Sequence, residues 1–198
     1  GLDGNKSGLF FEAVRALKEI QPKYFLMENV ASMKLKDRNK ISEILGVEPI
    51  LIDSKTLSAQ GRRRLYWTNI PNVKQPENKG LTLKDIIQPT EENVYKCKWE
   101  LWNGTENERF IGTIDHGGFE KEKRIQNLNF PSTCLTTFCR TFYLYEGKIH
   151  KVSPVECERL QTLPDNYTEG ISKTARLTAI GNGWTCDIIA HILKSMVF

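Results

Sequence analysis

The residues YFLMENV, positions 24–30, form a short apolar run that ends abruptly in Glu28 and Asn29. A strand buried in a parallel sheet of an α/β protein has this character, and ligands collect at its C-terminal end. A carboxylate there can accept a hydrogen bond from an exocyclic amine or share a proton with a ring nitrogen. It can equally cap a neighbouring helix or pair with an arginine. The run therefore predicts a buried parallel strand and marks Glu28 as a candidate site residue.

Two helices are expected around this strand. Apolar residues recur at helical spacing from Gly8 to Ile20, with Ser7 as the expected N-cap and Pro22 as the stop. A second helix is expected from about residue 39 to residue 45.

Two β-rich runs follow, PILIDSKTL at 49–57 and RRLYWTNI at 63–70, joined by a polar loop that contains glycine. Because alternate residues of a strand share a face, Arg62 and Arg64 are expected to present two guanidiniums to one carbonyl oxygen or phosphate. The alternative is a solvated edge strand whose charges discourage aggregation.

The character of the chain changes after Pro71. Residues 72–130 are polar and rich in Asn, Lys and Glu, with isolated aromatics, which predicts an irregular small domain inserted into the first. Residues 133–145 return to a β-rich pattern. Ser153 and Pro154 then predict the start of a helix that runs through Leu160.

The last expected element is a helix over residues 185–196, preceded by IGNGW at 180–184. We expect a turn there because it contains two glycines, which adopt conformations that other residues rarely do. The same glycines permit close backbone approach. An aromatic ring beside them can pack on a flat ligand. The same short pattern also occurs as a simple helix start.

Composition narrows the class of protein. The chain has 198 residues, 39% of them apolar, a net charge of +4 and a pI near 8.7, which suits a partner that carries phosphates but does not require one. Five cysteines without a C-x-x-C pair indicate reduced thiols rather than disulfides or zinc. No apolar run approaches the length of a membrane span.

The order of these features resembles the later motifs of the DNA cytosine-5 methyltransferase family. The series is ENV, Q-x-R-x-R beginning at Gln60, a polar variable region, SPVECERLQTLPDNY at 153–167 and GNGW at 181–184. The segments MENVASM, LIDSKTLSAQGRRRLYWTNIP and CLTTFCR look most like the branch that contains the mammalian de novo enzymes and their bacterial and phage relatives.

The resemblance implies the C-terminal portion of a Rossmann-like, S-adenosylmethionine-dependent methyltransferase fold with an inserted target recognition domain. Residues 1–71 would form the second half of the catalytic domain. Residues 72–140 would form the target recognition region, and residues 141–198 would return to the catalytic domain.

The resemblance also implies a mechanism. Members of the family flip the target cytosine out of the duplex, and a cysteine thiolate attacks carbon 6 so that carbon 5 can take a methyl group. Glu28 would hydrogen-bond the ring nitrogen and amine of the cytosine, and Arg64 would contact its carbonyl oxygen, with Arg62 beside it. Asn29 would hold the nearby loop in shape, and Gln60 would have a structural role.

Cofactor and DNA contacts are implied by the same resemblance. Asn182 and Trp184 would line the S-adenosylmethionine pocket. Thr136, Thr137 and Arg140 would contact double-stranded DNA. We expect a cytoplasmic protein encoded by a bacterium or a phage.

The chain also departs from the family pattern. It holds no Pro-Cys dipeptide, none of its cysteines precedes ENV, and the glycine-rich cofactor loop is absent. We therefore expect the chain alone to be inactive, and the strand YFLMENV to expose an apolar edge that pairs with the upstream half of the enzyme or with a second copy.

Two other functions stay open at this point. A non-catalytic DNA-binding or regulatory partner has no chemical need for Glu28, Arg62 and Arg64, so these residues favour an enzyme. A tRNA methyltransferase tends to carry a Cys-Phe-Thr signature, which TCLTT at 133–137 does not match, so DNA is the favoured substrate.

Overall fold

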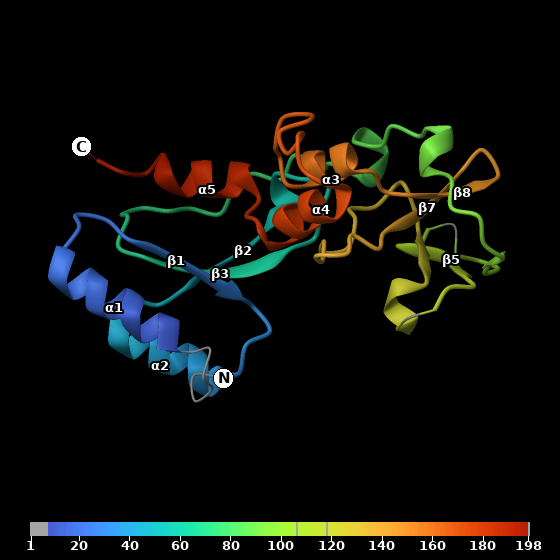
Figure 1. Ribbon diagram of the computed structural model, residues 1–198. Helices are drawn as coiled ribbons and strands as arrows, with labels where there is room; N and C mark the ends of the chain where they lie inside the picture. The colour runs from blue at the N-terminus through green and yellow to red at the C-terminus, as the bar shows by residue number, and fades with distance from the viewer. Residues whose placement is uncertain (1–7, 106, 118, 198) are drawn as a thin grey trace. The chain divides into compact units, whose positions relative to one another are not determined.

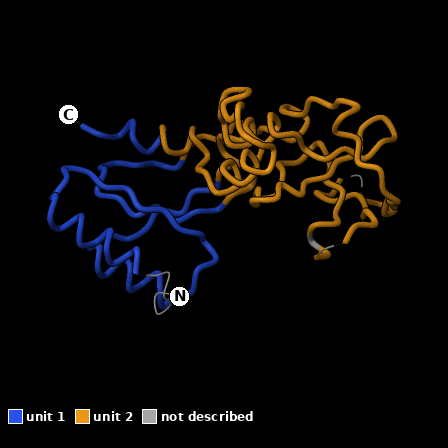
Figure 2. The backbone as a smooth tube through the Cα atoms, in the orientation of Figure 1, with its two compact units in different colours: residues 1–53, 63–75, 191–198 blue, residues 54–62, 76–190 orange. Residues whose placement is uncertain are grey.

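The computed structural model describes residues 8–105, 107–117 and 119–197, and the expected N-cap Ser7 lies outside them. Contacts divide the chain into two compact units. Unit 1 comprises residues 1–53, 63–75 and 191–198, and unit 2 comprises residues 54–62 and 76–190 (Figure 2). The functional roles predicted for residues 1–71, 72–140 and 141–198 are not tested by this division into units, and they stay predictions.

Unit 1 is built on a three-stranded antiparallel sheet with the order β1-β3-β2. Its strands are β1 (Leu26–Val30), β2 (Ile50–Asp53) and β3 (Arg63–Thr68), and its helices are α1 (Gly8–Ile20) and α2 (Leu35–Leu45). Both helices lie on one face of the sheet (Figure 1), where Ile41 and Phe10 join a cluster around Leu65 and Trp67. Burial of each such side chain stabilises the fold by roughly 1.5–3 kcal/mol.

Most expected elements of unit 1 are confirmed, with two corrections. Helix α1 has the expected bounds, whereas α2 begins at Leu35, about four residues before the expected start. Among the described residues β1 pairs with β3 alone, and this pairing is antiparallel, so the expected buried parallel strand is wrong here. Because β1 lies at the sheet edge, its residues are half-buried to exposed, and Val30 is 41% exposed.

Unit 2 contains a second sheet with the order β4-β5-β6-β7-β8. All neighbours in it are antiparallel except β6 and β7, which run parallel. Its strands are β4 (Trp99–Leu101), β5 (Phe110–Ile114), β6 (Arg124–Gln126), β7 (Phe142–Tyr145) and β8 (Lys148–Lys151). The described residues of the polar region 72–130 therefore form three short strands joined by long connections.

In the part of the chain that the structure describes, the remaining elements are short 3₁₀ helices and three α-helices. The 3₁₀ helices are η2 (Ser54–Thr56), η3 (Leu83–Asp85), η4 (Glu91–Asn93) and η5 (Glu120–Glu122). The α-helices are α3 (Pro154–Leu160), α4 (Lys173–Asn182) and α5 (Cys186–Leu193). No helix in the described part of the chain combines the length and apolarity that a membrane span needs.

The expected start of α3 is confirmed by a reciprocal cap. The Ser153 hydroxyl accepts a hydrogen bond from the Glu156 amide at 3.1 Å, and the Glu156 carboxylate accepts one from the Ser153 amide at 2.6 Å. The expected turn at 180–184 is wrong in part, because its first three residues complete α4, a helix that the sequence did not predict.

Candidate active-site and nucleic-acid-binding residues

The first candidate site is an ion pair on the sheet of unit 1. Glu28 on β1 lies opposite Tyr66 on β3, and Val30 lies opposite Arg64, so Glu28 and Arg64 are diagonal neighbours on one face. Arg64 Nε lies 2.6 Å from Glu28 Oε1, and the side chains are only 13% and 19% exposed, respectively. The structure thus places a carboxylate acceptor and a guanidinium donor side by side, a pattern that suits a planar ligand with both donors and acceptors.

A cavity of about 260 Å³ adjoins this part of β1. Glu28 and Asn29 line it together with mainly apolar residues of α1, β1, α2 and β3, namely Leu9, Phe10, Ala13, Met27, Ile41 and Trp67. The Asn29 side chain accepts a hydrogen bond from the Val30 amide at 2.8 Å. This bond joins adjacent residues at the end of β1, and the role predicted for Asn29 in the nearby loop stays a prediction.

Arg62 has partners of another kind. It is 5% exposed, and its guanidinium donates to the carbonyl oxygens of Leu135, Gly181 and Gly183 at 3.3, 3.2 and 2.9 Å. The expected pairing of Arg62 with Arg64 at one ligand does not match these contacts. Since β3 begins at Arg63, Arg62 precedes the strand, and the alternation rule does not apply to it.

Gln60 is fully buried in a network of side-chain amides. Its oxygen accepts from the Leu135 amide at 2.8 Å, and its nitrogen donates to the Leu160 carbonyl at 3.0 Å and to the Gln161 oxygen at 3.2 Å. Gln161 in turn donates to the Ile180 carbonyl at 2.8 Å. These contacts support the structural role predicted for Gln60. The importance of Gln161 was missed, although it lies inside the motif that follows Ser153.

Gly181 allows helix α4 to lie directly against the backbone of Thr136 and Thr137. A β-carbon added to Gly181 would lie 2.6 Å from the Thr136 carbonyl carbon and 2.7 Å from the Thr137 nitrogen. Only glycine fits such an approach. The close approach expected of this glycine therefore exists, and it positions the two threonines predicted to contact DNA.

Asn182 and Trp184 lie at the end of α4 and just after it. Asn182 is the last residue of the helix and is exposed, and Trp184 is 48% exposed. The structure thus leaves an indole ring accessible to a flat ligand. Binding of the cofactor by these two residues stays a prediction.

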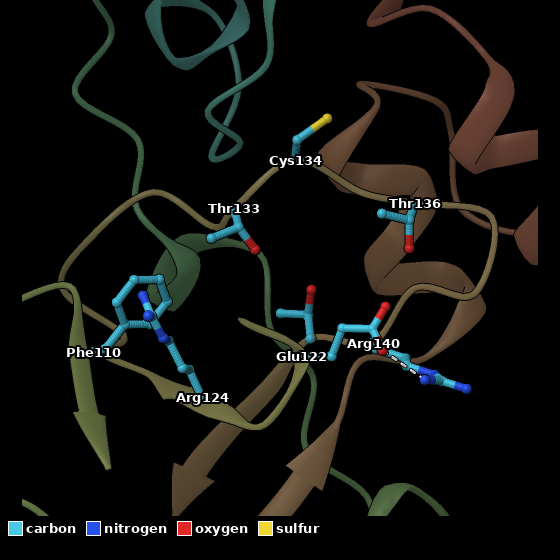
Figure 3. A pocket seen from close by; sticks show the side chains of 8 residues that line it. Phe110, Glu122, Arg124, Thr133, Cys134, Thr136 and Arg140 are labelled. Atoms are coloured by element: carbon cyan, nitrogen blue, oxygen red, sulfur yellow. Dashed lines mark hydrogen bonds and ion pairs between the residues drawn. The ribbon is translucent and has the colours of Figure 1, made fainter. Parts of the chain in front are cut away.

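A second cavity, of about 380 Å³, lies in unit 2 (Figure 3). It is lined by Phe110, Glu122, Arg124, Thr133, Cys134, Thr136, Arg140 and Thr141. Thr136 and Arg140 both line it, whereas Thr137 is not part of the lining, and the DNA contacts of all three stay a prediction. Phe110, Glu122 and Arg124 were not foreseen. Phe110 and Arg124 reach the cavity through the pairing of β5 with β6, and Glu122 lies on η5 just before β6, an arrangement that no local pattern encodes.

The two arginines that line this cavity each lie over the ring of a phenylalanine. Arg140 Nη1 lies 2.6 Å from Glu122 Oε2, and its guanidinium carbon lies 5.4 Å from the centre of the Phe138 ring. Arg124 lies over Phe110 at 5.0 Å. Each ring holds an arginine in place through a cation–π contact.

No group of three or more His, Cys, Asp or Glu side chains suited to a metal occurs among the described residues.

Two buried carboxylates, Glu156 and Glu158, make hydrogen bonds that stabilise the fold of unit 2. Glu156 accepts from Tyr143 at 2.8 Å, and burial together with this carboxylate raises the pKa of Tyr143. Burial opposes ionisation of Glu158, but hydrogen bonds from Thr168, Arg176 and Asn166 together lower its pKa.

The family model for C-5 cytosine-specific DNA methylases matches residues 1–48 and 113–197. The chain belongs to this family. The matched ranges contain Glu28, Asn29 and the residues predicted to contact DNA and cofactor, whereas Gln60, Arg62 and Arg64 lie between them.

Individual relatives of this methylase chain cover nearly all of it. It is 25% identical to the type II methyltransferase M1.ScrFI of Lactococcus lactis subsp. cremoris, over 100% of the chain and 57% of that protein. It is also 25% identical to the type II methyltransferase M.HhaI of Haemophilus parahaemolyticus, over 97% of the chain and 68% of that protein. The chain thus spans less than two thirds of the length of M1.ScrFI.

The fold is similar to that of a solved methyltransferase structure. A prophage-encoded protein of Escherichia coli, assigned as a DNA modification methyltransferase, superimposes with a TM-score of 0.69 at 19% identity, over 98% of this chain and 75% of that one. This likeness confirms the α/β methyltransferase fold expected from the motifs.

Proposed function

We propose that this methylase chain supplies the base-binding, DNA-binding and part of the cofactor-binding surface of a DNA cytosine-5 methyltransferase. The reaction transfers a methyl group from S-adenosylmethionine to carbon 5 of a flipped-out cytosine. The observation that carries the proposal is the Glu28–Arg64 pair, at 2.6 Å on one face of the sheet.

The pair complements the polar edge of cytosine. A carboxylate can bind the ring nitrogen and the exocyclic amine, and a guanidinium can donate to the carbonyl oxygen. Nucleophilic attack on carbon 6 develops negative charge in the ring, and hydrogen bonds aimed at that charge stabilise the transition state. Glu28 and Arg64 would share this task, with Asn29 fixing the end of the strand.

The attacking thiolate would come from outside the sequence described here, since the chain holds no Pro-Cys dipeptide. We therefore propose that the chain alone is inactive. The upstream half of the enzyme would pair with the outer edge of β1, which has no strand partner among the described residues. If the edge instead pairs with a second copy, sedimentation will show a dimer. A monomer that also fails to bind the upstream half would contradict both forms of pairing.

The end of α4 fits the proposed cofactor. S-adenosylmethionine, when bound, supplies the methyl group. An adenine can stack on the exposed Trp184 ring, and the Asn182 amide can donate to or accept from its polar edge. Replacing Trp184 with alanine should weaken retention of labelled cofactor in equilibrium dialysis, and unchanged retention would remove this residue from the pocket.

The function is tested by complementation. Methyl transfer from labelled S-adenosylmethionine to mixed-sequence duplex DNA is measured with the chain alone, with the upstream half of a family member alone, and with both. We expect transfer only with both, in the bacterial setting that the two type II relatives suggest.

Two variants sharpen this test. Glu28→Gln should lower the rate by about 10²–10³-fold, the usual loss when one preorganised charge-stabilising group is removed. Glu43→Gln removes an exposed carboxylate on α2 and should leave the rate unchanged. Transfer by the chain alone would overturn the inferred position of the nucleophile. DNA binding without transfer in any mixture would favour a regulatory partner instead.

A further inference from the structure

The unit 2 cavity contains one arginine whose hydrogen-bond donors remain available. Arg124 on β6 is exposed, and its guanidinium lies over the Phe110 ring at 5.0 Å. No hydrogen bond or ion pair to its side chain occurs in the described part of the chain. The ring therefore fixes the position of the cation, while its planar fork of N–H groups stays free for a ligand.

Glu122 gives the same cavity an acceptor. Its Oε2 accepts from Arg140 at 2.6 Å, and the side chain is 17% exposed. Arg140 is thereby neutralised and held against Phe138, so it orients the carboxylate. Oε1 of Glu122 has no hydrogen bond among the residues described, which leaves it able to accept one from a ligand.

A free guanidinium beside a carboxylate does not suit a phosphate, because the carboxylate repels it. The mixture does suit the edge of a base pair. In the major groove, guanine offers the two acceptors O6 and N7 to an arginine, and its partner cytosine offers the N4 amine to a carboxylate. The exposed Thr136 and the half-buried Thr133 add hydroxyls at the cavity wall (Figure 3).

We infer that Arg124 and Glu122 recognise one G·C pair of the target site, Arg124 through the guanine and Glu122 through the cytosine. Arg140 acts as a positioning residue that orients Glu122. This inference rests on the proposed function and deepens it, since it names residues that determine specificity and the base pair that they select.

The test is sequence selection by the chain from a pool of random duplex DNA, followed by titrations with duplexes that vary one pair at a time. The wild-type chain should select a G·C pair at one position and discriminate against other pairs there by about 5- to 150-fold. Arg124→Ala should lower the discrimination at that position alone, leaving only the part that Glu122 supplies through the cytosine. Arg124→Lys keeps the charge but not the planar two-pronged donor, so its discrimination should fall between that of the wild type and that of Arg124→Ala.

Matched controls separate this role from simple charge effects. Arg15→Ala removes an exposed arginine of α1 and should leave every preference unchanged. Glu122→Gln should relax the selection for cytosine in the same pair. A uniform loss of affinity for all duplexes in Arg124→Ala, with a salt slope reduced by about one, would show a phosphate contact and overturn the inference.

The outcomes also separate the inference from the function beneath it. If the wild-type chain binds no duplex, the proposed DNA role fails and the inference falls with it. If the wild-type chain selects a sequence and Arg124→Ala selects the same one with undiminished discrimination, the inference alone is wrong.

Discussion

Replacing Gly181 with alanine should destabilise unit 2, although alanine is the better helix former. The added β-carbon would meet the Thr136 carbonyl group and the Thr137 nitrogen, with 2.6 Å to the carbonyl carbon and 2.7 Å to the nitrogen. These are backbone atoms, which cannot rotate away as the end of a side chain can. Either α4 or the segment at 136–137 must shift.

The size of the effect follows from two opposing contributions. Overpacking in a tight region costs about 1–3 kcal/mol. Alanine recovers up to about 1 kcal/mol through its helix propensity, and less at the last turn of a helix, where Gly181 lies. The free energy of unfolding should therefore fall by about 1–2 kcal/mol, which lowers the melting temperature by about 2–8 °C for a chain of this size.

The measurement is thermal and urea unfolding followed by circular dichroism, with Gly8→Ala as the control. Gly8 begins α1 and has nothing within 4 Å of an added β-carbon, so its replacement should be neutral or slightly stabilising. A Gly181→Ala variant as stable as the wild type would refute the packing argument. It would also remove the reason for placing Thr136 and Thr137 against α4.

Further predictions concern the buried polar groups. Arg62→Met should lower the free energy of unfolding by about 3 kcal/mol, since it leaves buried carbonyl groups without donors, whereas Arg63→Met at the exposed neighbouring position should change it little in urea titrations. Because the folded-state pKa of Glu158 lies below its ordinary 4.5, its contribution to stability is complete above that pH and is lost as pH falls through the lowered value. Between pH 7 and pH 3.5 the wild type should thus lose more stability than Glu158→Gln, while Glu169→Gln should follow the wild type. Identical pH profiles for all three proteins would contradict the role of Glu158.

Local patterns predicted the elements whose signals are contained within a few residues. The helix at 8–20 and the capped start of α3 at Ser153 follow from spacing and capping chemistry, and the structure has both. Helix α4 was missed because Gly181 weakens its helical signal. The glycine is required because the backbone of Thr136 lies against it. Thr136 is 45 residues away in the sequence, so no pattern within the helix itself indicates this requirement.

Some residues of the candidate sites could be predicted from the sequence, and others could not. Glu28 and Arg64 were identified separately. Their contact depends on the antiparallel register of β1 and β3, and local sequence patterns do not reveal that register. Arg62 was misjudged because strand alternation was extended one residue before β3. Arg124 carried no signal at all, since its importance comes from the ring of Phe110 on the neighbouring strand.

We propose that this chain helps to place a methyl group on carbon 5 of cytosine in DNA. The most direct test is to incubate the chain and the upstream half with duplex DNA and labelled cofactor, digest the DNA to nucleosides and identify the labelled product by mass spectrometry. We predict 5-methyldeoxycytidine, formed only when both parts are present and greatly reduced with Glu28→Gln. A label on adenine or on another atom of cytosine, or 5-methyldeoxycytidine at an undiminished rate with Glu28→Gln, would contradict the account.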